Sequence, residues 1–325
     1  MAGHSFGVGG EAVALEALEA ILGPPAHGET WIGDDAAVLC VGGEPLLFAS
    51  DLIAEGVHFS LAHTSLADVG WKALAVNISD VAAMGGRPFR AVVAIAGAFG
   101  PRLEDLYRGL LEASSAYGCP IVGGDLSAPA NGDGLVVSVA ILGTTEGRAP
   151  VLRSGARAGD RLYVTGALGA AAAGLRLLAK DAHALGACVD AHRRPRPRVV
   201  EGEAAARLGA RAMIDISDGL GIDLDRLARA SGLGVALEQL PVAQGATEAE
   251  ALEGGEDYEL LFAVPPEVAV EAAFEASGLT RPVAIGELVA DGDRRQLRGR
   301  PFAPAGYLHD TAPARSAAEG ATNAP

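Results

Sequence analysis

The chain contains few of the residues by which proteins bind nucleic acid, enter membranes or form disulfide frameworks. Lys and Arg number 25 against 41 Asp and Glu, giving a formal net charge of −16. This balance argues against a nucleic-acid backbone or an anionic membrane as a partner, and it suits a protein that recruits metal cations. No stretch approaches the roughly 18 uncharged apolar residues of a membrane-spanning helix, and no basic segment leads into an apolar run at the N-terminus. We therefore expect neither export nor a membrane partner.

Cysteine is equally rare, and the common nucleotide-binding motifs are missing. Cys40, Cys119 and Cys188 are odd in number, widely spaced and without CxxC spacing. This pattern favours reduced thiols in the cytoplasm over a disulfide framework or a zinc site. The sequence has no GxxxxGKS or GxxxxGKT loop and no HRD or DFG pattern. A nucleotide enzyme with this sequence would belong to neither the P-loop nor the protein-kinase class.

Length and pattern indicate two domains. The chain has 325 residues, half of them hydrophobic, whereas one domain usually has about 150 residues. Predicted strands alternate with predicted helices, so the fold class is α/β, or α+β where the sheets are mixed. The stretch 143–159 is rich in Gly and Arg with little periodicity, and it predicts a boundary near Gly147. We expect domains at 1–146 and 147–310 and a disordered, Ala/Pro/Thr-rich tail at 311–325.

One stretch, residues 71–86, organises the first domain. Its sequence WKALAVNISDVAAMGG predicts a helix over 73–84 that is apolar on all sides and stops at Gly85-Gly86. Asn77 and Asp80 stand three residues apart and share one face of this buried helix. A buried carboxylate is costly unless cations or hydrogen bonds compensate it. Asp80 is therefore either a structural residue bonded to backbone amides or part of a larger site.

Further carboxylates sit at predicted turns, strand ends and helix starts. Asp34 and Asp35 follow Gly33, and Asp51 follows a predicted strand at 46–50. Ser217 is a predicted helix N-cap, a position where free amides can bind phosphate. Each of these acids alone could be a solvated cap. The set comprises Asp34, Asp51, Asp80, Asp125 after Gly123-Gly124, Asp215 and Asp218.

Convergence of these carboxylates would have a chemical consequence. They would raise one another's pKa values, and divalent cations would relieve the repulsion. A set of oxygen ligands without paired His or Cys indicates Mg²⁺ or Ca²⁺, and Mg²⁺ usually arrives with substrate phosphates. The residues themselves therefore predict a metal-dependent enzyme acting on phosphates.

Six ordered motifs carry a family resemblance: IGDDAAVL (32–39), the segment 50–59 from Ser-Asp to His-Phe, WKALAVNISDVAAMGGRP (71–88), IVGGDLS (121–127), IDISDGL (214–220) and GGEDYELLF (254–262). In these the sequence resembles the thiamine-monophosphate kinases, which share a superfamily with aminoimidazole ribonucleotide synthetase. The resemblance implies two α/β domains, an N-terminal mixed sheet that pairs in a homodimer, and direct, Mg²⁺-assisted transfer of the ATP γ-phosphoryl group to thiamine monophosphate.

The resemblance also implies roles for individual residues. Catalysis would rest on Asp51, Asp80, Asp125 and Asp218. Substrate contacts would come from His58, Glu256 and, more loosely matched, Tyr307, and ATP contacts from Arg153, Ser217, Gly124 and Tyr107. Ala49 departs from the family pattern, which often has a hydroxyl residue there. The implied Mg²⁺ ligands are Asp34, Ser50, Asp51, Asp80, Asp125, Asp215 and Asp218.

Two alternatives stay open at this point. A sister enzyme of the superfamily would need its own nucleophile. A selenide water dikinase needs a reactive Cys near its N-terminus, but the first Cys of this sequence is Cys40, which lies in a predicted strand. A hydrogenase-maturation carbamoyl dehydratase needs a Cys at its C-terminus, but the last four residues of this sequence are TNAP. A non-catalytic, acidic cation-binding protein would explain the charge but not the Gly-Gly-Asp and Ser-Asp-Gly turns.

Overall fold

The computed structural model describes residues 11–97, 102–128 and 134–307, with side chains from residue 17 onward. Ala26–Tyr307 forms one compact unit, and helix α1 (Glu11–Leu22) belongs to a second unit made of Met1–Pro25 and Leu308–Pro325. The predicted tail at 311–325 lies outside the described residues. No helix in the described part of the chain is long and apolar enough to cross a membrane.

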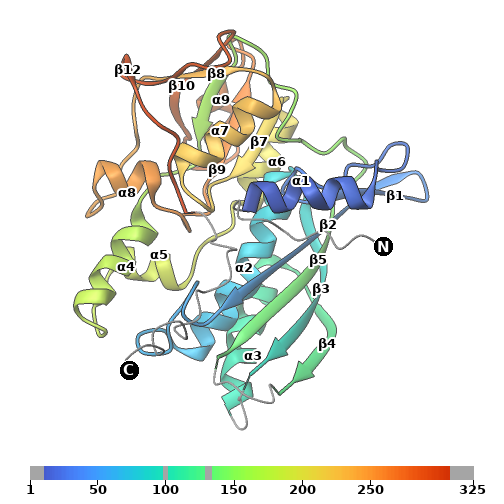
Figure 1. The fold of residues 1–325 in the computed structure, drawn as a ribbon, viewed down its shortest axis with the longest axis vertical. Coiled ribbons are helices and arrows are strands. Elements are labelled where there is room, and N and C mark those ends of the chain that lie inside the picture. The colour runs from blue at the N-terminus through green and yellow to red at the C-terminus, as the bar shows by residue number, and fades with distance from the viewer. Residues whose placement is uncertain (1–10, 98–101, 129–133, 308–325) are drawn as a thin grey trace, which may run out of the picture. The chain divides into compact units, whose positions relative to one another are not determined.

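The N-terminal half of the larger unit is a five-stranded sheet with helices on one face (Figure 1). Its strand order is β1-β2-β5-β3-β4, in which β3 and β4 are parallel and the other neighbours antiparallel. The elements are β1 (Ala37–Val41), β2 (Glu44–Ala54), α2 (Leu66–Ala83), β3 (Arg87–Ala96), α3 (Leu103–Tyr117), β4 (Ile121–Ser127) and β5 (Val136–Thr144).

Helix α2 is the predicted buried helix, and it begins two turns earlier than the sequence indicated. Ser65 caps it, because its hydroxyl accepts the Asp68 N–H at 3.1 Å. Gly85, with φ of 69°, ends it in the left-handed conformation predicted for this position. A Cβ at Gly109 of α3 would lie 1.7 Å from the Ala67 carbonyl oxygen, so this glycine lets α2 and α3 pack closely.

The C-terminal half is a seven-stranded sheet of order β12-β11-β8-β10-β6-β9-β7, flanked by helices. The sequence missed α5, α8 and β8, which are short. Its elements are β6 (Arg161–Val164), α4 (Ala170–Lys180), α5 (Ala187–Arg193), α6 (Val199–Arg207), β7 (Ala212–Asp215), α7 (Leu220–Ala230), β8 (Gly234–Leu237), α8 (Glu248–Glu253), β9 (Leu260–Val264), α9 (Val270–Ala276), β10 (Val283–Val289), β11 (Arg295–Leu297) and β12 (Arg300–Pro301).

Helix α2 belongs to the packing of both halves. Its apolar side chains fill the core of the first sheet. Ala82 and Ala83, in its last turn, instead join a cluster with Met213 of β7 and Leu260 and Phe262 of β9. The side chain of Asp80, one turn earlier, is therefore carried to the junction between the two sheets.

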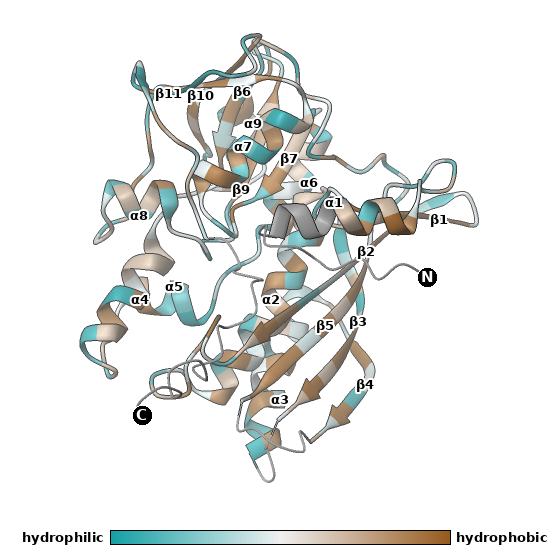
Figure 2. Cartoon of the chain, in the orientation of Figure 1, coloured by the Kyte–Doolittle hydropathy of each residue, from teal (hydrophilic) through white to brown (hydrophobic). Residues whose placement is uncertain are grey.

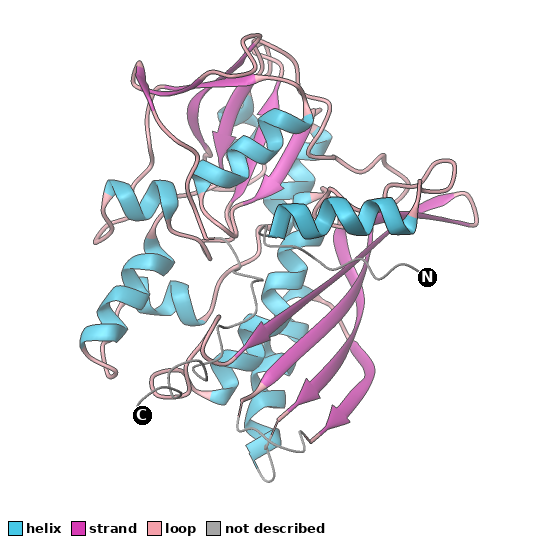
Figure 3. Cartoon of the chain, in the orientation of Figure 1, coloured by secondary structure: helices cyan, strands magenta, loops and turns pink. Residues whose placement is uncertain are grey.

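The N-terminal sheet leaves its other face uncovered by α2 and α3 (Figure 3). Along β2 and β3 the buried residues alternate with exposed apolar ones. Phe48, Leu52 and Val92 on this face are 42%, 53% and 42% exposed. The strands are coloured as predominantly hydrophobic in Figure 2. We call this surface, defined by Phe48, Leu52 and Val92, the outer face.

Candidate active site

Three carboxylates from distant parts of the sequence converge at the junction of the two sheets. Asp35 lies in the turn before β1, Asp80 on α2, and Asp215 at the end of β7. One oxygen of each lies within 4.8 Å of the other two. We call these residues the carboxylate cluster. The sequence analysis expected Asp34 in this place, whereas the structure places its neighbour Asp35 there.

Burial and mutual repulsion raise the pKa values of this cluster. Desolvation, followed by the charges of Asp51, Asp215 and Asp35, raises the pKa of Asp80 well above its ordinary value. The pKa of Asp215 rises for the same reasons, although Ser79 Oγ donates a 2.5 Å hydrogen bond to its Oδ2. Without a cation, the cluster therefore releases its protons less readily than ordinary carboxylates do.

Arg153 supplies positive charge to this region. Its Nη2 lies 2.8 Å from Asp35 Oδ1, and its backbone N–H donates to both oxygens of Asp34 at 3.2 and 3.1 Å. Burial and the charge of Asp35 raise the pKa of Asp34 to about 7. Asp35 Oδ2 is buried without a hydrogen-bond partner. Three converging carboxylates, one of which has an unpartnered buried oxygen, fit a divalent cation such as Mg²⁺.

Asp51 is held beside the cluster by α2. Its backbone N–H donates to Asn77 Oδ1 at 2.8 Å, and the Asn77 amide donates to the Ala73 carbonyl at 3.0 Å. Strand β2 runs on to Ala54, so Asp51 lies within the strand and not at its end as predicted. Ser50 consequently points to the opposite side of the sheet, with Phe48 and Leu52, because side chains alternate along a strand.

Asp125 also lies away from the cluster. Strand β4 continues through the Gly-Gly-Asp turn that the sequence predicted and ends at Ser127. Asp125 pairs with Ala94 and lines a hollow of about 340 Å³ on the outer face, together with Val92, Gly124 and Ser138. The structure thus does not bring Ser50, Gly124 or Asp125 to the three carboxylates.

The loop 217–219 is held by an acid that the sequence analysis missed. Asp223 Oδ2 accepts the backbone N–H groups of Ser217, Asp218 and Gly219 at 3.1, 3.0 and 3.1 Å. The N-cap of α7 is Gly219 and not Ser217, so the predicted cap is wrong. These amides already bind a carboxylate of the chain, which removes the argument for a phosphate site at this helix terminus. An Asp within the first turn of a helix is the signal that could have revealed this role.

The remaining contacts of this loop involve Asp218. Arg226 Nη1 lies 2.6 Å from Asp218 Oδ2 and 2.7 Å from Asp223 Oδ1. The Tyr307 N–H donates to the Asp218 carbonyl at 2.8 Å. The structure therefore places Tyr307 beside Asp218, where the resemblance implied an aromatic residue near the site.

Glu256 is engaged in two ion-pair contacts from residues that the sequence analysis did not single out. Its Oε1 lies 2.5 Å from Lys72 Nζ and its Oε2 lies 3.1 Å from His192 Nδ1. Burial would raise the pKa of Glu256, but Lys72 and His192 outweigh that effect and lower it to about 2. A lysine within an otherwise apolar helix sequence was the signal available for this pair.

His58 has a defined tautomer. Its Nδ1 accepts the Ala54 N–H at 3.1 Å, so the ring proton of the neutral form resides on Nε2. His58 lies in the turn after β2, and its carbonyl accepts Lys72 Nζ at 2.9 Å. The ring therefore presents an Nε2–H donor.

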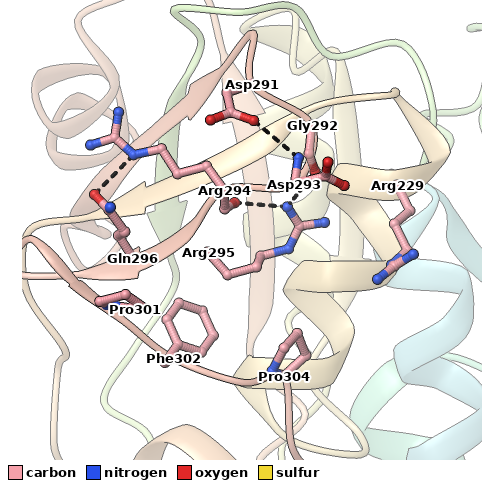
Figure 4. A pocket seen from close by; sticks show the side chains of 10 residues that line it. All are labelled: Arg229, Asp291, Gly292, Asp293, Arg294, Arg295, Gln296, Pro301, Phe302 and Pro304. Atoms are coloured by element: carbon pink, nitrogen blue, oxygen red, sulfur yellow. Dashed lines mark hydrogen bonds between the residues drawn. The ribbon is translucent and has the colours of Figure 1, made fainter.

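Two other features lie outside this site. Tyr107 on α3 packs against the N-terminal core. A surface cavity of about 730 Å³ is bordered by β11 and β12, at the sheet edge opposite β7 and Asp215 (Figure 4). Arg295 in this cavity pairs with Asp225 and donates to the Gly292 and Arg294 carbonyls, so it is a structural residue.

Both halves of the chain match a defined class of proteins. Residues 33–145 match the model of the AIR synthase related protein, N-terminal domain, and residues 157–297 match that of the C-terminal domain. Together these spans cover more than half of the chain.

Individual relatives narrow the class. The thiamine-monophosphate kinase of Rhodopirellula baltica is 40% identical over 287 residues, covering 79% of this chain and 83% of the relative. That of Bacillus subtilis is 36% identical over 270 residues, covering 78% and 82%. The solved structure of AaThiL complexed with AMPPCP and TMP has a TM-score of 0.82 at 30% identity, covering 94% of this chain and 100% of that one. The chain belongs to the thiamine-monophosphate kinase family of AIR synthase related proteins.

The raised pKa values predict how stability depends on pH. In the metal-free protein the folded state binds protons that the unfolded chain has lost between about pH 4 and 7, because folding raises the pKa of Asp34 to about 7 and those of Asp80 and Asp215 above their ordinary values. Stability should therefore fall as the pH rises through this window. In EDTA we expect melting at least about 3 °C higher at pH 5.5 than at pH 7.5.

Saturating Mg²⁺ should weaken or reverse this dependence, because the metal competes with protons for the same oxygens. Differential scanning fluorimetry at the two pH values, with and without Mg²⁺, measures both effects. An identical pH dependence with and without the metal would contradict the assignment of the cluster as a cation site.

Replacing Asp80 by Asn should separate stability from turnover. The change removes one of the repelling charges, so the metal-free Asp80→Asn protein should melt at or above the wild-type temperature. Turnover at saturating Mg²⁺ should fall by about a hundredfold or more, because a metal ligand is lost. Asp291→Asn, an exposed acid at the distant cavity, serves as the control and should leave both quantities unchanged. A near wild-type rate for Asp80→Asn would overturn the metal role.

Proposed function

We propose that the chain transfers the γ-phosphoryl group of ATP to thiamine monophosphate, giving thiamine diphosphate and ADP. The observation that supports this most directly is the carboxylate cluster with its unpartnered Asp35 Oδ2. The family and the related AaThiL structure with AMPPCP and TMP supply the substrates.

The residues fit Mg²⁺ as the metal. Asp35, Asp80 and Asp215 would hold it, with Asp34, Asp51 and Asp218 nearby. Mg²⁺ bound there neutralises the phosphates that meet in the reaction. Arg153, which pairs with Asp35, and Ser217, next to Asp218, would contact ATP.

The chain's own residues orient the acceptor. The Nε2–H of His58 would donate to the phosphate of thiamine monophosphate, and Glu256 would face the cationic ring system. The attacking phosphate oxygen already carries negative charge, so it needs no strong base, and positioning can supply most of the catalysis. We propose a direct in-line displacement without a phosphoenzyme.

We further propose a homodimer that pairs through the outer face. Phe48, Leu52 and Val92 leave apolar surface in water, which is typical of an interaction site. Ser50 and Asp125 lie on this same face, so in a dimer they would approach the interface. That Tyr107 and Gly124 contact ATP stays a prediction.

The cysteines support a location in a reducing compartment. Cys40, Cys119 and Cys188 are all unpaired thiols. Reduced thiols are typical of the cytoplasm, where we propose that the protein acts.

Product analysis tests the reaction. Incubation with ATP, Mg²⁺ and thiamine monophosphate should yield ADP and thiamine diphosphate in equal amounts, separated by chromatography. EDTA should abolish the reaction, because the cluster then lacks its cation. AMP as the nucleotide product, or no turnover, would instead indicate a sister reaction of the superfamily.

ATP made chiral at the γ-phosphorus then tests the direct route. One in-line displacement inverts the configuration at phosphorus, whereas a phosphoenzyme route retains it. Retention, or label trapped on His58, would contradict direct transfer.

Light scattering tests the proposed dimer. The wild-type protein should have twice the chain mass of 32.8 kDa, whereas Leu52→Asp should place a charge in the interface and give the single-chain mass. Leu185→Asp is the control, because Leu185 is equally apolar, 83% exposed and lies between α4 and α5. A Leu52→Asp protein that keeps twice the chain mass would exclude the outer face as the interface.

A further inference from the structure

Lys72 is a buried cation on helix α2, and none of the roles described above uses it. Its side chain is 1% exposed, and His192 on α5, which approaches the same carboxylate, is also buried. We propose that Lys72 and His192 are positioning residues for the acceptor: they hold Glu256 and the His58 turn in the geometry that binds thiamine monophosphate. This inference rests on the proposed function.

The first support is that Lys72 joins the two segments expected to bind the acceptor. Its Nζ lies 2.5 Å from Glu256 Oε1, in the loop before β9, and 2.9 Å from the carbonyl oxygen of His58, in the turn after β2. These segments are almost 200 residues apart in the sequence (58 and 256). One ammonium group therefore sets the separation of the two acceptor contacts.

The second support is the backbone of the loop that carries Glu256. Glu256 and Tyr258 have φ angles of 67° and 51°, in the left-handed region that side chains other than glycine rarely adopt. The Glu256 N–H is bonded to the Ser217 carbonyl at 2.7 Å, and the Tyr258 N–H to the Ile216 carbonyl at 2.9 Å. Strained residues persist where surrounding contacts fix them, and Lys72 and His192 are the contacts that fix the Glu256 carboxylate.

The third support is the balance of energies. A buried ion pair usually adds little net stability compared with apolar side chains of similar size. A purely structural α2 would therefore gain from an apolar residue at position 72. The positive charge of Lys72 is better explained by its effect on Glu256: it fixes the orientation of the Glu256 carboxylate. The Glu256 side chain is still 23% exposed and can face a ligand.

The loop is also continuous with the carboxylate cluster. The buried Tyr258 lies close enough to Glu256, Asp51, Asp215 and Asp80 for their charges, after burial itself, to raise its pKa.

Steady-state kinetics of Lys72→Met tests the proposal. Met fills most of the same volume without the charge. We expect the KM for thiamine monophosphate to rise about tenfold or more and the KM for ATP to change less than about twofold. Glu203→Gln is the matched control: like Lys72, Glu203 is a fully buried charged side chain, and its partner Arg87 is half-exposed and lies outside the proposed acceptor contacts. It should lower the melting temperature and leave both KM values unchanged.

Two further variants keep the proposal testable if Lys72→Met folds poorly. His192→Asn retains an N–H donor near the position of Nδ1, so its KM for thiamine monophosphate should stay within about threefold of wild type. His192→Leu lacks that donor and should raise this KM about fivefold or more. Equal effects of Asn and Leu, or parallel changes in both KM values, would overturn the positioning role.

The two hypotheses fail in different ways. Wild-type protein that forms no thiamine diphosphate contradicts the proposed function. Wild-type protein that turns over, while Lys72→Met and His192→Leu keep their KM for thiamine monophosphate, contradicts this inference alone.

Discussion

Repulsion among the buried carboxylates of Asp35, Asp80 and Asp215 is the constraint on which the arrangement of the site depends. The three acids come from a turn, a helix and a strand end, so the folding of both sheets brings them together. Apolar burial of α2 in two cores offsets the cost of this approach. A cation binding to a site assembled in this way would find its ligands already brought together by the fold.

Helix α2 carries the cation Lys72 in its first half and the carboxylate Asp80 near its C-terminal end. Lys72 and Asp80 are eight residues apart, which corresponds to about 12 Å along the helix axis. Lys72 serves the Glu256 loop, and Asp80 serves the cluster. Because both residues belong to one helix, the proposed acceptor contacts and the proposed metal ligands would keep a fixed spacing. In-line transfer between two bound phosphates requires such a spacing.

The sequence predicted the parts of the fold that local pattern determines. Helix α3 (Leu103–Tyr117) can be read from the sequence with these bounds, because its apolar face repeats at helical spacing and Gly118 follows its last residue. Short elements such as α8 were missed, since six residues carry little periodicity. The motif 254–262 does not reveal that β9 begins only at Leu260, because the left-handed residues Glu256 and Tyr258 before it depend on tertiary contacts.

Predictions of site residues were wrong where pairing between strands overrides the local turn signals of the sequence. Glycine and aspartate suggested that strands end at Asp51 and Asp125, but pairing carries both strands further. Alternation along the strands then decides the face, so Ser50 and Asp125 point away from the cluster. The sequence likewise could not show whether Asp34 or Asp35 belongs to the carboxylate cluster. Their positions depend on contacts with Arg153, which lies more than a hundred residues later.

A raised pKa alone would not have separated structural acids from metal ligands. Burial raises the pKa values of Asp34, Asp223 and Asp257 alike to about 7. Their partners differ. Asp223 accepts three backbone N–H groups, and Asp257 accepts those of Gly169 and Ala171 at the start of α4. These two acids are compensated by the chain itself. Asp35 Oδ2 has no such donor, and Asp35 lies beside two other carboxylates; this difference in partners is what favours the cluster as a cation site.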